Sequence, residues 1–241
     1  MNAPEVSVIV PVFNNAALPV RIRLVAGLAI TFALAPAMPA PPPIPAGSWL
    51  GLAVIGEQML IGMMMGFALR ITFVALDVAG ELIGLQMGLS FATFFDPGSS
   101  GESPVIAAFL GLLTALIFLA MNGHLLTLTL LAESFTLLPV STAPFHAVAL
   151  SSLLTASAMM FSLGVMLALP LITALLVTNI SLGVLARVAP TLNLFAVGFP
   201  VTLALGFIVL LLSLPYIGAA MEGVFNGGFM ALEAILRAAA G

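Results

Sequence analysis

The chain has 241 residues, of which 62% are hydrophobic and only 6% are charged: nine acidic residues, five arginines and no lysine. Because soluble globular proteins carry about a quarter charged residues, this composition excludes soluble enzymes, nucleic-acid-binding proteins and disordered proteins, and it indicates a surface that mostly faces lipid or other apolar protein. Cysteine is absent, which excludes disulfide bonds, catalytic thiolates and cysteine-based metal sites.

The N-terminal part predicts short elements. The apolar run 6–13 is too short to cross a bilayer, and residues 22–35 predict a helix. Six prolines in the segment 36–45 exclude a regular helix there and predict a rigid linker outside the membrane. No basic region precedes an apolar core, since the first arginine is Arg21, so a cleaved secretory signal is not expected.

Most of the remaining chain predicts membrane-type helices. Four intervals without charged residues are long enough for a span of about 20 apolar residues, and these are 24–56, 103–132, 134–186 and 188–221. The third interval could hold a two-pass hairpin. Pro170 and Pro200 lie inside apolar sequence and predict kinked or broken helices. The expected fold is therefore all-α, with helical hairpins in a single domain over 1–241.

Turn-forming residues predict the connections between these helices. Residues 96–104 form a polar loop rich in Gly, Ser and Pro, and Asn122-Gly123 interrupts the next apolar run. Further connections are expected at Pro139 to Pro144 and at Ala189-Pro190-Thr191.

Charged residues interrupt the region 57–102, whose other residues are typical of an apolar helix. Arg70 and Asp77 are two turns apart on one helix face, and Asp77 and Glu81 are an i,i+4 pair of like charge. An ionisable group in hydrocarbon costs about 3 kcal/mol or more, so these groups must face protein, water or a partner. They are interpreted as a buried charge network or a helix segment in water, with a proton or ion relay as the alternative.

Glycines in the same region recur at four-residue spacing, which places them on one helix face. They are Gly62 and Gly66, followed by Gly80, Gly84 and Gly88. A ridge of glycines lets another helix backbone approach closely. The pattern predicts either packing within the chain or an interface between subunits.

Signals for catalysis or metal binding are weak. His124 and His146 are the only histidines, and they have no carboxylate at metal-ligand spacing. Nucleophile-elbow, zinc-protease, phosphate-loop and dinucleotide-binding motifs are absent from the sequence. We expect no metal, no cofactor and no enzymatic activity.

Three stretches together resemble the FliR family of flagellar export-gate subunits. They are Gly84–Pro97, then Asn122-Gly123-His124 with Ser134-Phe135 and Leu138-Pro139 downstream, and finally Leu182–Pro200. The resemblance covers roughly residues 10–236. The same fold family includes a subunit of type III secretion injectisomes.

The resemblance implies a single-copy subunit that completes a helical ring with FliP-type and FliQ-type subunits, near the FlhB-type switch subunit. This ring gates the passage of unfolded flagellar proteins across the bacterial inner membrane. Its hairpins stand largely above the hydrocarbon core, toward the periplasm, which would leave Arg70, Asp77 and Glu81 outside lipid. Family members usually carry a longer segment before the part that matches Val10–Asn15, so the N-terminal helix looks truncated here.

The resemblance also implies a channel plug in the loop between the two central hairpins. Its residues here are Phe91, Phe94, Phe95, Asp96, Pro97 and Gly98. The alternative is that these aromatic side chains pack in a helix groove. Three other functions stay open: an injectisome gate subunit, a secondary transporter with its site at Arg70, Asp77 and Glu81, and a passive membrane scaffold.

Overall fold

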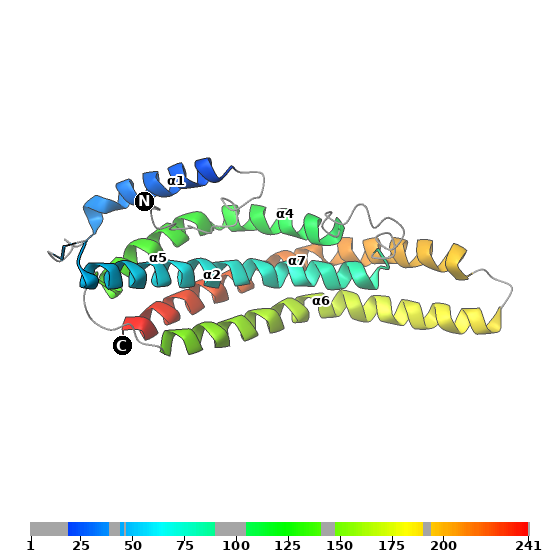
Figure 1. Cartoon of the computed structure of the whole chain (residues 1–241). Helices are drawn as coiled ribbons and strands as arrows, with labels where there is room; N and C mark the ends of the chain where they lie inside the picture. Colours follow the sequence, from blue (N-terminus) through cyan, green and yellow to red (C-terminus); the bar gives the residue numbers. More distant parts are fainter. Residues whose placement is uncertain are drawn as a thin grey trace. The chain divides into compact units, whose positions relative to one another are not determined.

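The computed structural model describes residues 19–38, 44–45, 47–89, 105–140, 148–189 and 194–240. Within these ranges 92% of the residues are helical and none is in a strand. The predicted all-α fold is therefore confirmed for the described part of the chain (Figure 1).

The described residues form six α-helices and one short 3₁₀-helix. In chain order these are α1 (Val20–Leu34), η1 (Ala35–Ala37), α2 (Trp49–Gln86), α4 (Val105–Ala120), α5 (Gly123–Leu137), α6 (Val148–Val188) and α7 (Leu194–Ala240). The helix expected at 22–35 is confirmed as α1. The charged, glycine-rich region also forms a helix, since α2 is continuous from Trp49 to Gln86.

One expectation about the long apolar intervals is wrong. The interval 134–186 holds the end of α5 and one helix of 41 residues, α6, in place of a two-pass hairpin. The helices are not broken at Pro170 or Pro200, since α6 and α7 continue through these residues, and the alternative, a kink at each proline, stays a prediction. A proline removes one backbone hydrogen bond, and in these helices the turns on either side maintain the helix.

Three helices are long and apolar enough to cross a membrane: α2, α6 and α7 from Val197 onward. The pair α4 and α5, bent by 64° at its break, would be a fourth span. At a rise of about 1.5 Å per residue, α6 with its 41 residues is about 60 Å long, about twice the thickness of the hydrocarbon core. A large part of each long helix must therefore lie outside the hydrocarbon.

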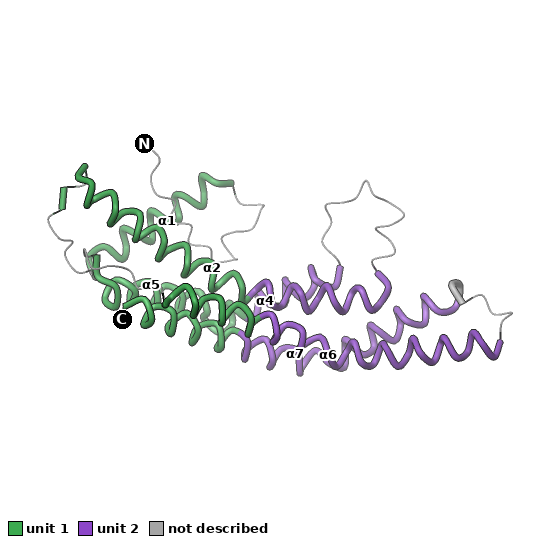
Figure 2. Tube along the Cα trace, turned by 60° about the horizontal axis from the view of Figure 1, so that its bottom comes forward, with its two compact units in different colours: residues 1–72, 118–160, 225–241 green, residues 73–117, 161–224 purple. Residues whose placement is uncertain are grey.

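The chain divides into two compact units, shown in Figure 2. Unit 1 comprises residues 1–72, 118–160 and 225–241, and unit 2 comprises 73–117 and 161–224. Each unit draws on α2, α6 and α7, so its core is assembled from segments far apart in the sequence. The expected single domain over 1–241 stays a prediction.

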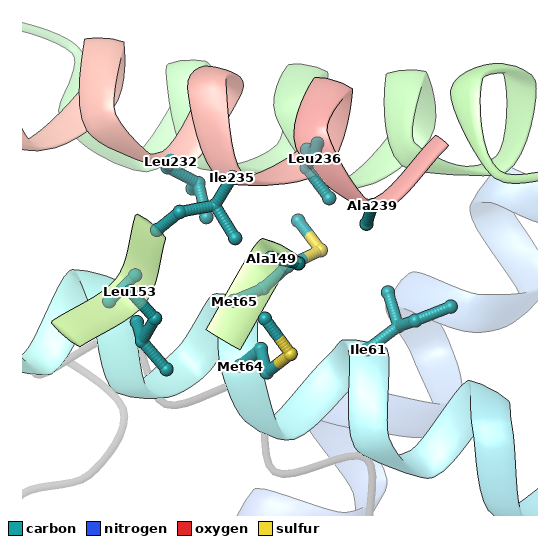
Figure 3. Close-up of a cluster of buried hydrophobic side chains, with 10 residues drawn as sticks. Ile61, Met64, Met65, Ala149, Leu153, Leu232, Ile235, Leu236 and Ala239 are labelled. Atoms are coloured by element: carbon teal, nitrogen blue, oxygen red, sulfur yellow. The ribbon is translucent and has the colours of Figure 1, made fainter. Parts of the chain in front are cut away.

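Unit 1 has a core in which α2, α6 and α7 meet. Figure 3 shows the α2 side chains pointing toward those of α7, with the α6 residues beside them. The buried residues are Ile61, Met64, Met65, Ala68, Ala149, Leu153, Leu232, Ile235, Leu236 and Ala239. Burial of each large aliphatic side chain contributes about 1.5–3 kcal/mol, so this cluster is a main source of the stability of unit 1.

Unit 2 has its own apolar core, contributed by α2, α4, α6 and α7. Its fully buried large side chains are Leu76, Ile83, Met87, Ile106, Leu110, Leu171, Leu175, Ile217 and Met221. The buried Thr114 hydroxyl donates a hydrogen bond of 2.7 Å to the carbonyl oxygen of Leu110, one turn earlier in α4. This bond satisfies the hydroxyl within its own helix, so a polar residue can lie in an apolar core.

Candidate functional site

Three of the four charged side chains of α2 lie on its exposed face. Arg70, Asp77 and Glu81 are each exposed in the isolated chain, and the two interpretations, a charge network buried by a partner and a helix segment in water, stay predictions. Their separations of seven and four residues keep them on one face of the helix, and the opposite face carries the apolar core residues. A charged stripe on an apolar helix requires water or a partner beside it, because lipid would penalise it.

The α2–α4 crossing in unit 2 is antiparallel and very close. A Cβ atom added at Gly80 would lie 2.6 Å from the Cα atom of Ala107, a distance that side-chain atoms do not tolerate. One turn away, a Cβ on Gly111 would lie 3.6 Å from Oδ1 of Asp77. Gly80 therefore lets α4 approach so closely that the carboxylate of Asp77 lies beside Gly111 of α4.

The other glycines of the predicted ridge have different surroundings. A Cβ at Gly84 would make an ordinary contact of 3.8 Å with Ile106. At Gly62 no atom lies within 4 Å of that position, and Gly66 is buried. Gly80 packs within the chain, whereas the open side of Gly62 leaves room for another helix.

Gly88 ends α2 and does not extend the ridge. It has a positive φ of 80°, the left-handed conformation that glycine adopts most easily. Its N–H donates to the carbonyl oxygen of Leu85 at 3.0 Å, and the N–H of Leu89 donates to that of Gly84 at 3.1 Å. These two bonds form a Schellman motif, which satisfies the last carbonyl groups of the helix.

The predicted plug residues lie outside the described residues. Phe91, Phe94, Phe95, Asp96, Pro97 and Gly98 all fall between Leu89 and Val105. The structure does describe the stem of this loop, which is the tight α2–α4 crossing and the glycine-capped end of α2. The plug assignment itself stays a prediction.

The break between α4 and α5 lies at Asn122-Gly123, where the sequence predicted an interruption. Asn122 has a positive φ of 56°, and asparagine tolerates this conformation better than most residues. A Cβ at Gly123 would lie 2.5 Å from the ring of Phe118. The Asn-Gly pair thus combines a left-handed turn with space for a buried aromatic ring.

Phe118 is the centre of an aromatic cluster in unit 1. It is fully buried, and its ring centroid lies 5.3 Å from that of Phe225 and 6.3 Å from that of Phe229. Aromatic pairs at such separations are stabilising beyond the area they bury. The cluster therefore joins the start of the α4–α5 break to α7.

Sequence reasoning missed the glycines that make the other closest approaches. A Cβ at Gly164 would clash with the carbonyl oxygen of Ala75, and one at Gly228 would clash with Oγ1 of Thr72. Neither glycine has another glycine four residues before or after it in the sequence. Only the adjacent pair Gly227-Gly228, inside an apolar helix, signals a close contact in advance.

Groups that could bind a metal do not gather in the described ranges, where no cluster of three or more His, Cys, Asp or Glu side chains occurs. His124 is half-buried, and its Nδ1 atom has no hydrogen-bond partner. His146 lies outside the described residues.

The long apolar helices, the exposed charges on α2 and the glycine-based crossings together define a helical protein of the membrane. Residues 5–228 match the family described as bacterial export proteins, family 1. The chain belongs to this family, which confirms the family predicted from the sequence motifs.

The related proteins include several described as flagellar biosynthetic protein FliR. The protein from Escherichia coli (strain K12) is 42% identical over 94% of this chain and 86% of its own length. The protein from Pectobacterium carotovorum subsp. carotovorum is 45% identical over the same shares. The protein from Caulobacter vibrioides is 38% identical over 85% of this chain and 82% of its own length.

Proposed function

We propose that this chain is a subunit of the flagellar type III protein export gate in the bacterial inner membrane. With FliP-type and FliQ-type subunits, near an FlhB-type subunit, it forms the channel through which unfolded flagellar proteins pass. The proposal rests on one observation: over 94% of its length, the chain is similar to flagellar biosynthetic proteins FliR. The flagellar name of these relatives favours the flagellar gate over the injectisome gate.

The surface of the chain supports a role within an assembly. α2 exposes Arg70, Asp77 and Glu81 beside apolar side chains such as Met63 and Phe67. Lipid would penalise the charges and water would penalise the apolar groups, so a protein partner or a water-filled channel wall suits this face better. The excess length of α2, α6 and α7 over the bilayer supports a gate that extends beyond the hydrocarbon, and its position on the periplasmic side is part of the proposal.

Native mass spectrometry tests the proposed assembly. The chain would carry a tag and be co-expressed with FliP-type and FliQ-type subunits, and an untagged chain would be the control for non-specific recovery. We expect one copy of this chain in a defined hetero-oligomer. Recovery as a monomer or homodimer without these partners would contradict the proposal and would favour a transporter with its site at Arg70, Asp77 and Glu81.

A second experiment tests the proposed plug. Replacing Phe91 and Phe94 with alanine should leave assembly intact and raise ion leakage through the closed gate several-fold, because the aromatic side chains fill a narrow lumen. Conductance across reconstituted membranes measures this leakage. Phe207→Ala, at an exposed position of α7, is the matched control. Unchanged conductance in the Phe91/Phe94 variant would support packing in a helix groove.

A further inference from the structure

Helix α1 has no fully buried side chain, and only one narrow stripe of it is half-buried, at Arg23, Ala26, Gly27, Ile30 and Leu34. Val25 is 66% exposed and Phe32 is 78% exposed, yet both are large apolar groups. A helix that packs on a protein core normally buries one apolar stripe. The surroundings that the remaining faces of α1 require are therefore supplied by something outside the described part of the chain.

The polar groups of α1 are confined to its first turn, apart from one threonine. Arg21 and Arg23 lie at the N-terminal end, and the helix has no acidic residue. The hydroxyl of Thr31 donates to the carbonyl oxygen of Gly27 at 2.9 Å, so it is satisfied within the helix. Beyond Arg23, α1 offers no polar stripe to water or to a polar partner surface.

The exposed apolar side chains of α1 also surround much of the helix. The largest are Val20, Ile22, Leu24, Val25, Leu28 and Phe32. At about 100° per residue these positions span about 200° of the circumference. A partner helix would cover one stripe, whereas a lipid phase covers all of these directions at once.

The length of α1 decides how it can lie in lipid. Its 15 residues are about 22 Å long, which is short of the hydrocarbon core of about 30 Å. The helix can therefore enter a bilayer without crossing it. An arginine side chain extends from the end of such a helix to the headgroups and favours anionic lipid, and here Arg21 is exposed at the N-terminal end.

Trp49 provides an independent observation in the same unit. It is the first residue of α2 and is 87% exposed. The hydroxyl of Ser48 accepts a hydrogen bond of 3.0 Å from the N–H of Gly51, which fixes the start of the helix beside this indole. Tryptophan is enriched at the boundary between lipid and water, because its ring is apolar and its N–H is polar.

We propose that α1 is a lipid-immersed segment that enters one leaflet of the bilayer, with Arg21 at anionic headgroups and Trp49 at the lipid–water boundary. This inference uses residues of unit 1 alone and does not depend on the export function. It assigns a specific environment to α1, which is a leaflet that contains anionic phospholipid.

The absence of cysteine from the chain allows a clean test. Phe32→Cys in the full chain would carry a nitroxide label, in vesicles of phosphatidylcholine with or without phosphatidylglycerol. Electron paramagnetic resonance would measure collisions with oxygen, which enters lipid, and with a water-soluble nickel chelate. Ala156→Cys, at a partly buried position packed against the core of unit 1, is the protein-packed control.

We expect oxygen collisions several-fold more frequent at position 32 than at position 156, with few nickel collisions at either. Phosphatidylglycerol should raise the oxygen-to-nickel ratio at position 32. Arg21→Gln should abolish that increase, whereas Arg21→Lys, and Arg187→Gln at the exposed end of α6, should retain it. Frequent nickel collisions would place α1 in water, and protection from both reagents would place it against protein; either result overturns the proposal. An unchanged ratio with phosphatidylglycerol would overturn the anionic preference.

Discussion

Replacing Gly80 with leucine will prevent stable folding of unit 2, whereas the same replacement at Gly62 will leave the fold intact. The added Cβ alone would lie 2.6 Å from the Cα atom of Ala107 and 3.1 Å from its N atom. Overpacking costs about 1–3 kcal/mol when side chains can move. Here the obstacle is backbone, so α2 and α4 must separate and the cost should reach or exceed about 3 kcal/mol.

Gly62→Leu is a matched control on the same helix. Both replacements gain about 0.8 kcal/mol or more of helix propensity, but only Gly80 has a close neighbour. Recovery of monodisperse protein in detergent and its thermal unfolding midpoint measure the difference. Equal stability of the two variants would contradict the close α2–α4 crossing.

The same pair of variants separates packing within the chain from packing between subunits. If the open side of Gly62 receives a partner helix, Gly62→Leu will fold but will assemble poorly with the FliP-type and FliQ-type subunits. Normal assembly of Gly62→Leu would exclude a close subunit contact at this residue.

The glycines of α2 show how far the sequence could predict the site. Four-residue spacing correctly indicated a shared helix face for Gly80 and Gly84, because helical periodicity is a local property. It could not distinguish the tight position at Gly80 from the open one at Gly62, since the neighbours come from other parts of the chain. It also could not show that the helix ends before Gly88.

The charges of α2 show a related limit. The sequence placed Arg70, Asp77 and Glu81 on one face and predicted that they need protein, water or a partner. It did not indicate that this face is exposed in the isolated chain. The contacts of Gly80 with α4 determine which side of α2 is covered, and those contacts involve residues distant in sequence.

Helix boundaries were predicted least well where they were placed from intervals free of charged residues and not from local turn residues. Turn residues located the break at Asn122-Gly123 correctly, because left-handed backbone and close approach require particular residue types. Charged residues did not mark the helix ends, since α2 and α7 continue past Glu81 and Glu222. Helices much longer than the bilayer can carry charges within them.

Phe118→Ala will lower the stability of unit 1 by about 3–5 kcal/mol, the usual cost of removing a buried phenylalanine side chain. Phe118 is fully buried and contacts Phe225 and Phe229. For a chain of this size the unfolding midpoint should fall by about 10 °C. Phe109→Ala, at a position of α4 that is 43% exposed, should change the midpoint little. Equal midpoints for the two variants would exclude a structural role for the aromatic cluster.

A double-mutant cycle with Gly123 connects this cluster to the α4–α5 break. Gly123→Ala alone should be destabilising, because its Cβ would lie 2.5 Å from the Phe118 ring. In the Phe118→Ala background that clash disappears, although the carbonyl oxygen of Phe118 remains 2.9 Å from the same position. We therefore expect Gly123→Ala to cost less in the double variant, with a coupling energy of about 1 kcal/mol or more. Additive effects would show that the ring and the glycine stabilise the break independently.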